Sequence, residues 1–195
     1  VSSATGITAA RIAMAIASYE RTQFTAATPF DVYLESGDLN VMTPLEQEGF
    51  DVFSSSNCNS CHTPNLLSNN TFKFTGVRPR SDDPGRMAVT GLAEDEGRMK
   101  VPSLRNVELR PPYMRNGRFP TIESVVDFYS RGGDFHPNEL PGGALNLDPQ
   151  EKLALAAFLK RPLTDPRLAG EQPPFDRPRL YTETDRVPVV GWFGG

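Results

Sequence analysis

The hydrophobic positions of the chain gather into a few segments with helical spacing, separated by long stretches without it. Between residues 7 and 24, apolar side chains recur on one broad side, and Glu20 and Arg21 form a polar end. This spacing predicts an amphipathic helix over 7–24, and Pro29 closes that part of the chain. The apolar side is made by Ile7, Ile12, Met14, Ala15, Ile16 and Tyr19.

Capping signals predict three further helices. Residues 43–46, Thr-Pro-Leu-Glu, combine a capping box with proline at the first helical position, and residues 148–151, Asp-Pro-Gln-Glu, repeat that pattern. Thr121 can cap a third helix, which the glycine pair 132–133 would stop, and Pro162 ends the last one. The apolar residues that follow the caps are Phe50, Val52, Phe53, Ile122, Val125, Val126, Tyr129, Leu153, Leu155, Ala156, Phe158 and Leu159.

The segments between these helices are long and irregular. Residues 64–105 show little periodicity, and residues 165–195 form a proline-rich tail of extended pieces. The 18 prolines and 16 glycines of the chain agree with ordered loops rather than a helical bundle with short turns. We therefore expect an all-α fold with long loops, divided into a leading helix and interdomain-type segment (1–42), a compact domain (43–164) and an extended tail or linker (165–195).

Charge and hydropathy exclude two classes of partner. The formal net charge is −4, with acidic and basic residues interspersed, so a nucleic-acid partner is not expected. The longest apolar run, residues 7–19, is interrupted by Arg11, and no membrane-spanning segment is predicted. The chain begins with Val1 rather than methionine, which we expect of a mature or trimmed product.

The segment Cys58-Asn59-Ser60-Cys61-His62 holds both cysteines of the chain and one of its two histidines. This Cys-x-x-Cys-His spacing is typical of covalent haem attachment, in which the two thiols form thioether bonds and the histidine binds the iron. One covalent haem c is therefore expected, with His62 as the proximal ligand. Such a haem places the chain among exported proteins, in the bacterial periplasm or outside the cell.

Two other uses of these residues stay open. A structural zinc site needs about four protein ligands, and only His136 could join the residues of the motif. A redox-active disulfide would normally lie in a strand–helix–strand setting, which the surrounding pattern does not predict. With a haem, the predicted helices before and after the motif favour a class I cytochrome c-like haem domain.

Several segments in one order resemble a known family. Besides the haem motif they are residues 30–34, 101–107, 112–119 and 125–129, together with the glycine pair 132–133. Over residues 7–170 the chain is similar to the C-terminal, electron-relay haem domain of the bacterial di-haem cytochrome c peroxidase and MauG family. The resemblance implies two c-type haems in two domains, one that relays electrons and one that meets hydrogen peroxide.

With one attachment site, the chain resembles the relay half of such a peroxidase or MauG-like oxidase. The resemblance favours an oxidoreductase role, although this chain alone has no second haem site. A second haem domain or chain and a redox partner protein are the implied partners. The alternatives are a stand-alone monohaem electron carrier or a subunit of a larger redox complex, and, with less support, a haem-based sensor.

The resemblance also points to the second axial ligand of the iron. The position of the distal ligand falls on Tyr129, where MauG has tyrosine, and Met114 is the second candidate because methionine commonly completes a cytochrome c. Core packing would equally explain Tyr129, which lies seven residues after Ile122, and an open or water-bound iron is the remaining alternative. His136 lies in a Gly-Gly-Asp-Phe-His-Pro loop, where a solvated or propionate-contacting role is expected.

Three further residues are implied by the same family. Its calcium site uses two backbone carbonyls that fall on Arg110 and Pro112, although the family has threonine where Arg110 stands. Arg105 lies within the matched Leu-Arg-Asn run, and an arginine beside the haem edge can pair with a propionate. We therefore expect calcium at Arg110 and Pro112, and Arg105 at the haem.

Overall fold

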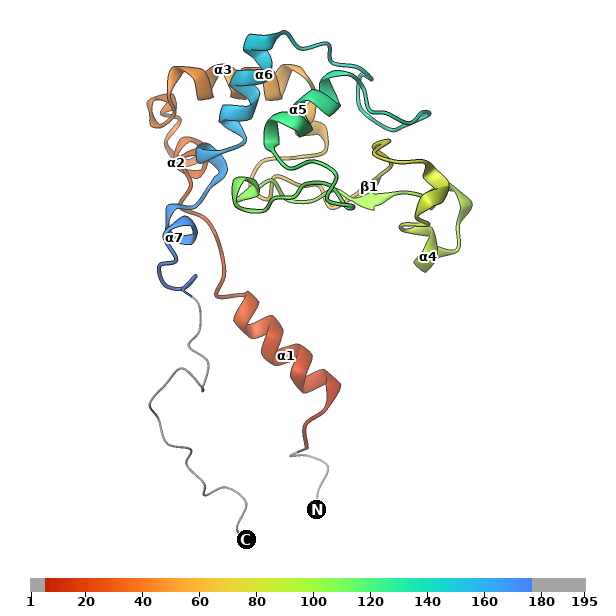
Figure 1. The fold of residues 1–195 in the computed structure, drawn as a ribbon. Coiled ribbons are helices and arrows are strands. Elements are labelled where there is room, and N and C mark those ends of the chain that lie inside the picture. The colour runs from red at the N-terminus through yellow and green to blue at the C-terminus, as the bar shows by residue number, and fades with distance from the viewer. Residues whose placement is uncertain (1–5, 177–195) are drawn as a thin grey trace. The chain divides into compact units, whose positions relative to one another are not determined.

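The computed structural model describes residues 6–176, which fall into two units. The larger unit is Thr25–Ala169, and residues 6–24 and 170–176 are the described parts of the smaller one. The helices are α1 (Ala9–Glu20), α2 (Pro29–Ser36), α3 (Pro44–Ser55), α4 (Met87–Thr90), α5 (Ile122–Ser130), α6 (Pro149–Phe158) and α7 (Pro166–Ala169), and the strands are β1 (Phe72–Lys73) and β2 (Met99–Lys100) (Figure 1). Short 3-10 turns occupy Leu39–Val41, Cys58–Ser60, Arg80–Asp82, Ala93–Asp95, Val107–Leu109 and Arg161–Leu163.

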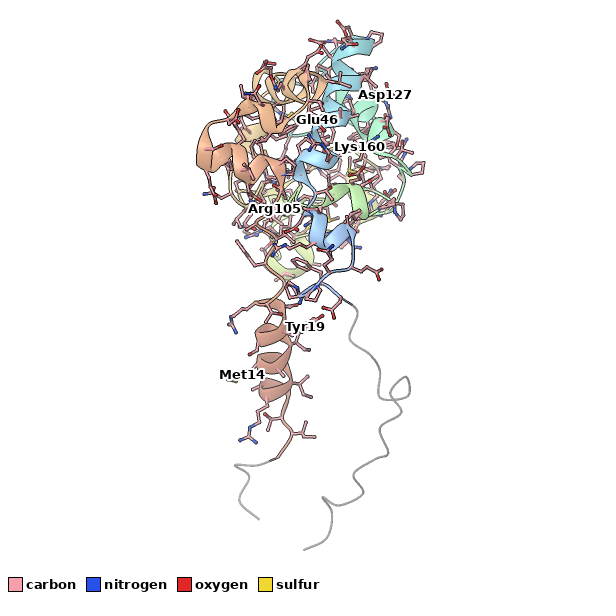
Figure 2. All side chains as sticks on the ribbon, turned by 90° about the vertical axis from the view of Figure 1, so that its left-hand side faces the viewer. Met14, Tyr19, Glu46, Arg105, Asp127 and Lys160 are labelled. Carbon is pink, nitrogen blue, oxygen red and sulfur yellow. The ribbon has the colours of Figure 1, made fainter. Side chains whose placement is uncertain are left out.

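Helix α1 of the smaller unit confirms the predicted leading helix within narrower limits. Thr8 caps it by accepting a hydrogen bond from the backbone N–H of Arg11. Among the described residues of this unit, α1 contributes no buried side chain, and Met14 and Tyr19 stand out from it (Figure 2). The exposed fraction is 68% for Met14 and 50% for Tyr19, so α1 presents apolar side chains at its surface.

The three predicted caps of the larger unit are confirmed. Thr43, Thr121 and Asp148 each accept a backbone hydrogen bond from the third helical residue, whose own side chain returns a bond to the cap. A similar box at Thr28 starts α2, which the hydrophobic pattern did not predict. Pro29 was interpreted as the end of a segment, but it is the first residue of this helix, where its missing N–H costs nothing.

The core of the larger unit lies between α2, α3 and α6. Phe158 on α6 is fully buried, and its ring centroid lies 5.4 Å from Phe30, 5.4 Å from Phe50 and 5.3 Å from Phe53. Helices α3, α5 and α6 lie side by side in Figure 1, and α6 contacts both of the others. Because α3 runs directly into the haem motif, this packing holds the motif in place.

Helices α3 and α6 approach each other most closely at Gly49. A Cβ atom added to Gly49 would lie 2.0 Å from the carbonyl oxygen of Ala154 and 2.8 Å from the Cβ of Phe158. Glycine is required because only a residue without a side chain allows this backbone-to-backbone contact.

The long segment between the haem motif and α5 is ordered by short elements and ion pairs. Strand β1 pairs antiparallel with β2, and the guanidinium of Arg86 lies over the ring of Phe72, 4.1 Å from its centroid. Arg98 bridges Asp95 and Glu139, which joins this segment to the loop after α5. The expected long loops are confirmed, and the chain is an all-α protein in which the described strands span two residues each. The three-part division with borders at residues 42 and 164 stays a prediction.

Candidate haem site

A cavity of about 670 Å³ opens in the larger unit, beside the haem motif. This volume lies in the range of pockets that enclose an organic cofactor. Its walls come from the haem motif, both strands, residues 101–116, helices α5 and α6, and the loop at residues 139–145. Most of the wall is apolar, which suits the face of a porphyrin.

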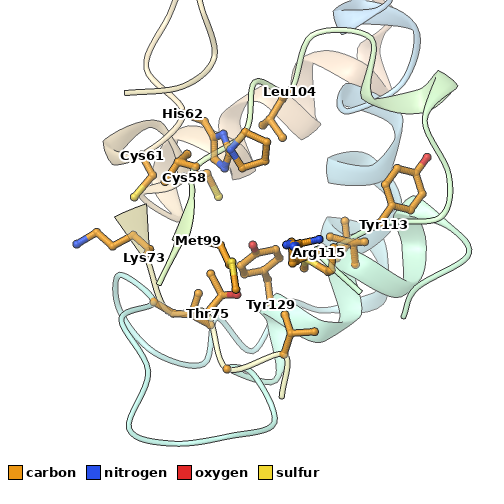
Figure 3. Close-up of a pocket in the computed structure, with 18 of the residues that line it drawn as sticks. Cys58, Cys61, His62, Lys73, Thr75, Met99, Leu104, Tyr113, Arg115 and Tyr129 are labelled. Atoms are coloured by element: carbon orange, nitrogen blue, oxygen red, sulfur yellow. The ribbon is translucent and has the colours of Figure 1, made fainter. Parts of the chain in front are cut away.

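Both cysteines of the motif line this cavity. Cys58 opens a 3-10 turn, Asn57 before it adopts a left-handed conformation at φ 60°, and the N–H of His62 donates to the carbonyl of Cys58 over 2.9 Å. Both thiols are free and half-buried. Burial raises the pKa of Cys58 to about 11, and the neighbouring Cys61 adds to the rise. The two sulfurs lie at the edge of the space that the haem would fill (Figure 3).

His62 lies on one wall of the cavity with a defined ring orientation (Figure 3). Its Nδ1 lies 2.9 Å from the carbonyl oxygen of Leu67. Since a carbonyl can only accept, Nδ1 carries the proton and Nε2 keeps the lone pair that an iron requires. Burial disfavours the imidazolium and lowers the pKa of His62, and it outweighs the carbonyls of Leu67 and Pro102, which raise that pKa; burial thus favours the neutral ring that binds a metal.

Tyr129 lies across the cavity from His62 (Figure 3). Burial raises the pKa of its phenol to about 12, and the two cysteine thiols add to the rise. None of the hydrogen bonds among residues 6–176 involves the Tyr129 hydroxyl, whereas the neighbouring Phe128 is completely buried in the core. The structure thus separates these two aromatic residues: Phe128 packs, and Tyr129 lines the cavity.

Two methionines line the same cavity. Met114 is half-buried and has a left-handed backbone at φ 67°. Met99, on strand β2, was missed by the sequence reasoning, and Figure 3 shows it on the same wall as Tyr129. A single methionine inside a segment without periodicity carries no local signal, so only the pairing of β1 with β2 reveals it.

The polar part of the wall carries an excess of positive charge. Five basic side chains line the cavity against one carboxylate, Glu139, which is paired with Arg98. Arg78 is paired with Asp83, whereas the other four make no hydrogen bond to a carboxylate among the described residues. Two haem propionates would offset part of this positive charge, so the residues present fit that cofactor. The four are Lys73, Lys100, Arg110 and Arg115.

The remaining expected residues fall in different places. Arg110 and Pro112 are exposed and line the cavity, so the structure brings them to the haem motif. Arg105 does not line it: its guanidinium is bound to Asp31 and to the carbonyls of Thr25 and Asn65. His136 lies in the loop after α5, and its Nδ1 faces the amide of Asn138 at 3.1 Å. The structure therefore differs from the expected propionate contact of Arg105.

In the part of the chain that the structure describes, no helix combines the length and the apolar character needed to cross a membrane.

Residues 46–161 match the family model described as "Cytochrome c". This region contains the haem motif, Tyr129 and the two methionines that line the cavity, Met99 and Met114.

The chain is also similar to larger haem proteins. It is 33% identical over 189 residues to the cytochrome c551 peroxidase of Nitrosomonas europaea, covering 93% of this chain and 51% of that protein. It is 27% identical to the methylamine utilization protein MauG of Methylorubrum extorquens, covering 82% of this chain and 46% of that protein. A MauG-like protein associated with microbial copper homeostasis shares the fold with a TM-score of 0.72 and 28% identity, covering 90% of this chain and 62% of that one.

The chain spans about half the length of the curated relatives it matches. This chain contains one haem motif, a cavity beside that motif, and His62 on the wall of the cavity. The match to the family model covers more than half of the chain and includes all of these features. The chain belongs to the cytochrome c family.

Proposed function

We propose that this chain is the electron-relay haem domain of a di-haem cytochrome c peroxidase or a MauG-like oxidase. One haem c, bound through Cys58 and Cys61, would supply reversible one-electron chemistry. A second haem domain, on the same or another chain, would react with hydrogen peroxide. The half-length match to relatives named as peroxidases and MauG supports this division.

The observation that carries the proposal is the pair His62 and Tyr129 on opposite walls of the cavity. We propose that both bind the iron. An iron with both axial positions filled can pass electrons but offers no position for peroxide. The apolar wall around it keeps water away and limits the reorganisation that electron transfer requires.

Peroxide tests this role directly. The haem-loaded chain is mixed with a tenfold excess of hydrogen peroxide while the Soret band is followed in a stopped-flow spectrometer. We expect no peroxide-dependent shift on the timescale of turnover, and a rapid shift in the complete protein if it carries a second haem. A rapid shift of the isolated chain would contradict the relay role. A complete protein with a single haem by intact mass would instead favour the stand-alone carrier.

Replacement of Tyr129 tests the distal ligand. In Tyr129→Phe, the tyrosinate-to-iron charge-transfer band and the matching ferric electron paramagnetic resonance signal should disappear. The phenolate stabilises oxidised iron, so its loss should raise the midpoint potential by at least about 60 mV, the equivalent of tenfold for one electron. The controls Met114→Leu and Met99→Leu should keep the band. A protein that shows no tyrosinate band before substitution, and in which one of these two methionine variants rather than Tyr129→Phe shifts the potential, would assign the ligand to that methionine.

Other parts of the proposal rest on the family resemblance. Calcium would bind beside the haem through the carbonyls of Arg110 and Pro112, with further oxygen ligands from the second domain. A redox partner protein would deliver electrons. Covalent haem attachment would put the assembly in the bacterial periplasm or outside the cell.

A further inference from the structure

The loop that follows the proximal histidine has a strained backbone. We call residues 63–68 the proximal loop. Within it, Asn65 and Leu67 adopt left-handed conformations at φ 72° and φ 49°. Leucine rarely adopts this conformation, and Leu67 is also buried, with 1% of its surface exposed. Such a conformation persists only where the surroundings hold it, so the contacts of this loop define how His62 is held.

Three successive residues, 103–105, hold the proximal loop by its carbonyl oxygens. The hydroxyl of Ser103 donates to the carbonyl of Leu66 over 2.6 Å, and the N–H of Leu104 donates to that of Leu67 over 3.3 Å. The Nε of Arg105 donates to the carbonyl of Asn65 over 2.5 Å. The Leu67 carbonyl also accepts the hydrogen bond from His62, so the position of this loop sets the geometry of the proximal ligand.

Arg105 is anchored on its other side to the start of α2. Its two terminal nitrogens form a bidentate pair with Asp31, at 2.9 Å and 2.5 Å, and one of them also donates to the carbonyl of Thr25 over 3.1 Å. The side chains of this pair are 13% and 11% exposed. Burial by itself would raise the pKa of Asp31, and hydrogen bonds from Arg105 and Thr28 outweigh it and lower that pKa.

We infer that Arg105 is a positioning residue for the proximal iron ligand: it fastens the proximal loop to α2 and so fixes the Leu67 carbonyl that orients His62. A firm hydrogen bond at Nδ1 makes the imidazole a stronger donor to iron and favours the ferric state. Loosening the loop weakens that bond. The inference rests on haem binding by His62 and is independent of the proposed peroxidase role.

The chain offers a matched control for this role. Arg161 pairs with Glu46, which is the third helical residue of α3 and closes its capping box, as Asp31 does in α2. Its Nε donates to one carboxylate oxygen of Glu46 over 2.8 Å, and its Nη2 donates to the other carboxylate oxygen and to the carbonyl of Val41. Among the described residues, Arg161 has no hydrogen bond to the proximal loop. Replacement of either arginine removes a helix-start ion pair, but only replacement of Arg105 releases the loop.

The experiment compares haem-loaded Arg105→Gln and Arg161→Gln by redox titration, ferric electron paramagnetic resonance and thermal unfolding. Both variants should unfold at lower temperature. Mutation of the groups that orient a metal ligand typically costs about tenfold or more in metal affinity or activity. We therefore expect Arg105→Gln to weaken the preference for ferric iron about tenfold, which is a rise of about 59 mV in midpoint potential. Arg161→Gln should leave both the potential and the g-values unchanged. Arg105→Lys keeps the positive charge but loses the bidentate guanidinium, so it should give an intermediate shift in midpoint potential.

Equal shifts in Arg105→Gln and Arg161→Gln would overturn the inference, since they would reflect general loosening. An unchanged potential in Arg105→Gln would overturn it as well. If Arg105→Gln fails to incorporate haem, Asp31→Asn serves as the second variant, because it keeps Arg105 and weakens only its anchor. It should shift the potential in the same direction by a smaller amount, and no shift there would reject the positioning role.

Discussion

Replacing both Cys58 and Cys61 with alanine should release all of the haem into acidified acetone, whereas the unchanged chain should keep it in the protein pellet. These are the only cysteines of the chain, and both line the cavity, so no other thiol can form a thioether. Each single variant should keep one bond and shift the pyridine haemochrome band. Pellet absorbance and intact mass measure the result.

A control inside the motif separates loss of the thiols from disturbance of the turn. Ser60 is exposed and donates to the carbonyl of Asn57 over 2.8 Å within the same 3-10 turn. Ser60→Ala should therefore keep its haem fully attached. Retention of haem by the double cysteine variant after acid extraction would refute covalent attachment through these two residues.

Gly49→Ala should destabilise the haem-loaded chain by about 3 kcal/mol, at the upper end of the usual cost of overpacking. The added methyl group would meet the carbonyl oxygen of Ala154 at 2.0 Å and its carbon at 2.6 Å, and both are backbone atoms that cannot rotate away. Helices α3 and α6 must therefore separate. Chemical denaturation followed by circular dichroism gives the free energy of unfolding.

Separation of α3 and α6 should also disturb the haem site, because α3 leads into Cys58 and Leu155 of α6 lines the cavity. Ser55→Ala is the control, since Ser55 is an exposed residue of the same helix. It should change the free energy of unfolding by no more than about 0.5 kcal/mol. If Gly49→Ala also changes the free energy of unfolding by no more than about 0.5 kcal/mol, α3 and α6 do not approach each other as closely at Gly49 as the structure shows.

The two cavity walls that carry His62 and Tyr129 depend on different parts of the molecule. The wall with His62 is built largely from neighbours in sequence, because Cys58, His62 and Leu67 lie within ten residues. The backbone N–H of His62 donates to the carbonyl of Cys58, and its Nδ1 donates to the carbonyl of Leu67. The distal side is assembled from β2, residues 112–116 and α5. Substitutions near Met99 or Tyr129 can therefore tune the potential without disturbing covalent attachment.

Local signals predicted a large part of the fold. The caps at Thr43, Thr121 and Asp148 were predicted correctly, because a cap forms between residues three positions apart and needs no distant partner. The haem motif is local in the same sense. Helix α2 was missed because Pro29 is compatible with both the end of a segment and the first turn of a helix, and only packing of Phe30 on Phe158 reveals which applies.

By itself, the sequence predicted an all-α fold from helical spacing and caps, which are local signals. It also predicted one haem attachment site, with His62 as the proximal ligand, because the spacing within five residues is typical of that chemistry. Only the tertiary structure decided that Arg105 binds Asp31 instead of facing the cavity, and that Met99 joins Tyr129 on the distal wall. Arg105 meets partners 40 and 74 residues away. Contacts over such separations depend on how the whole chain packs, and no local pattern of residues encodes them.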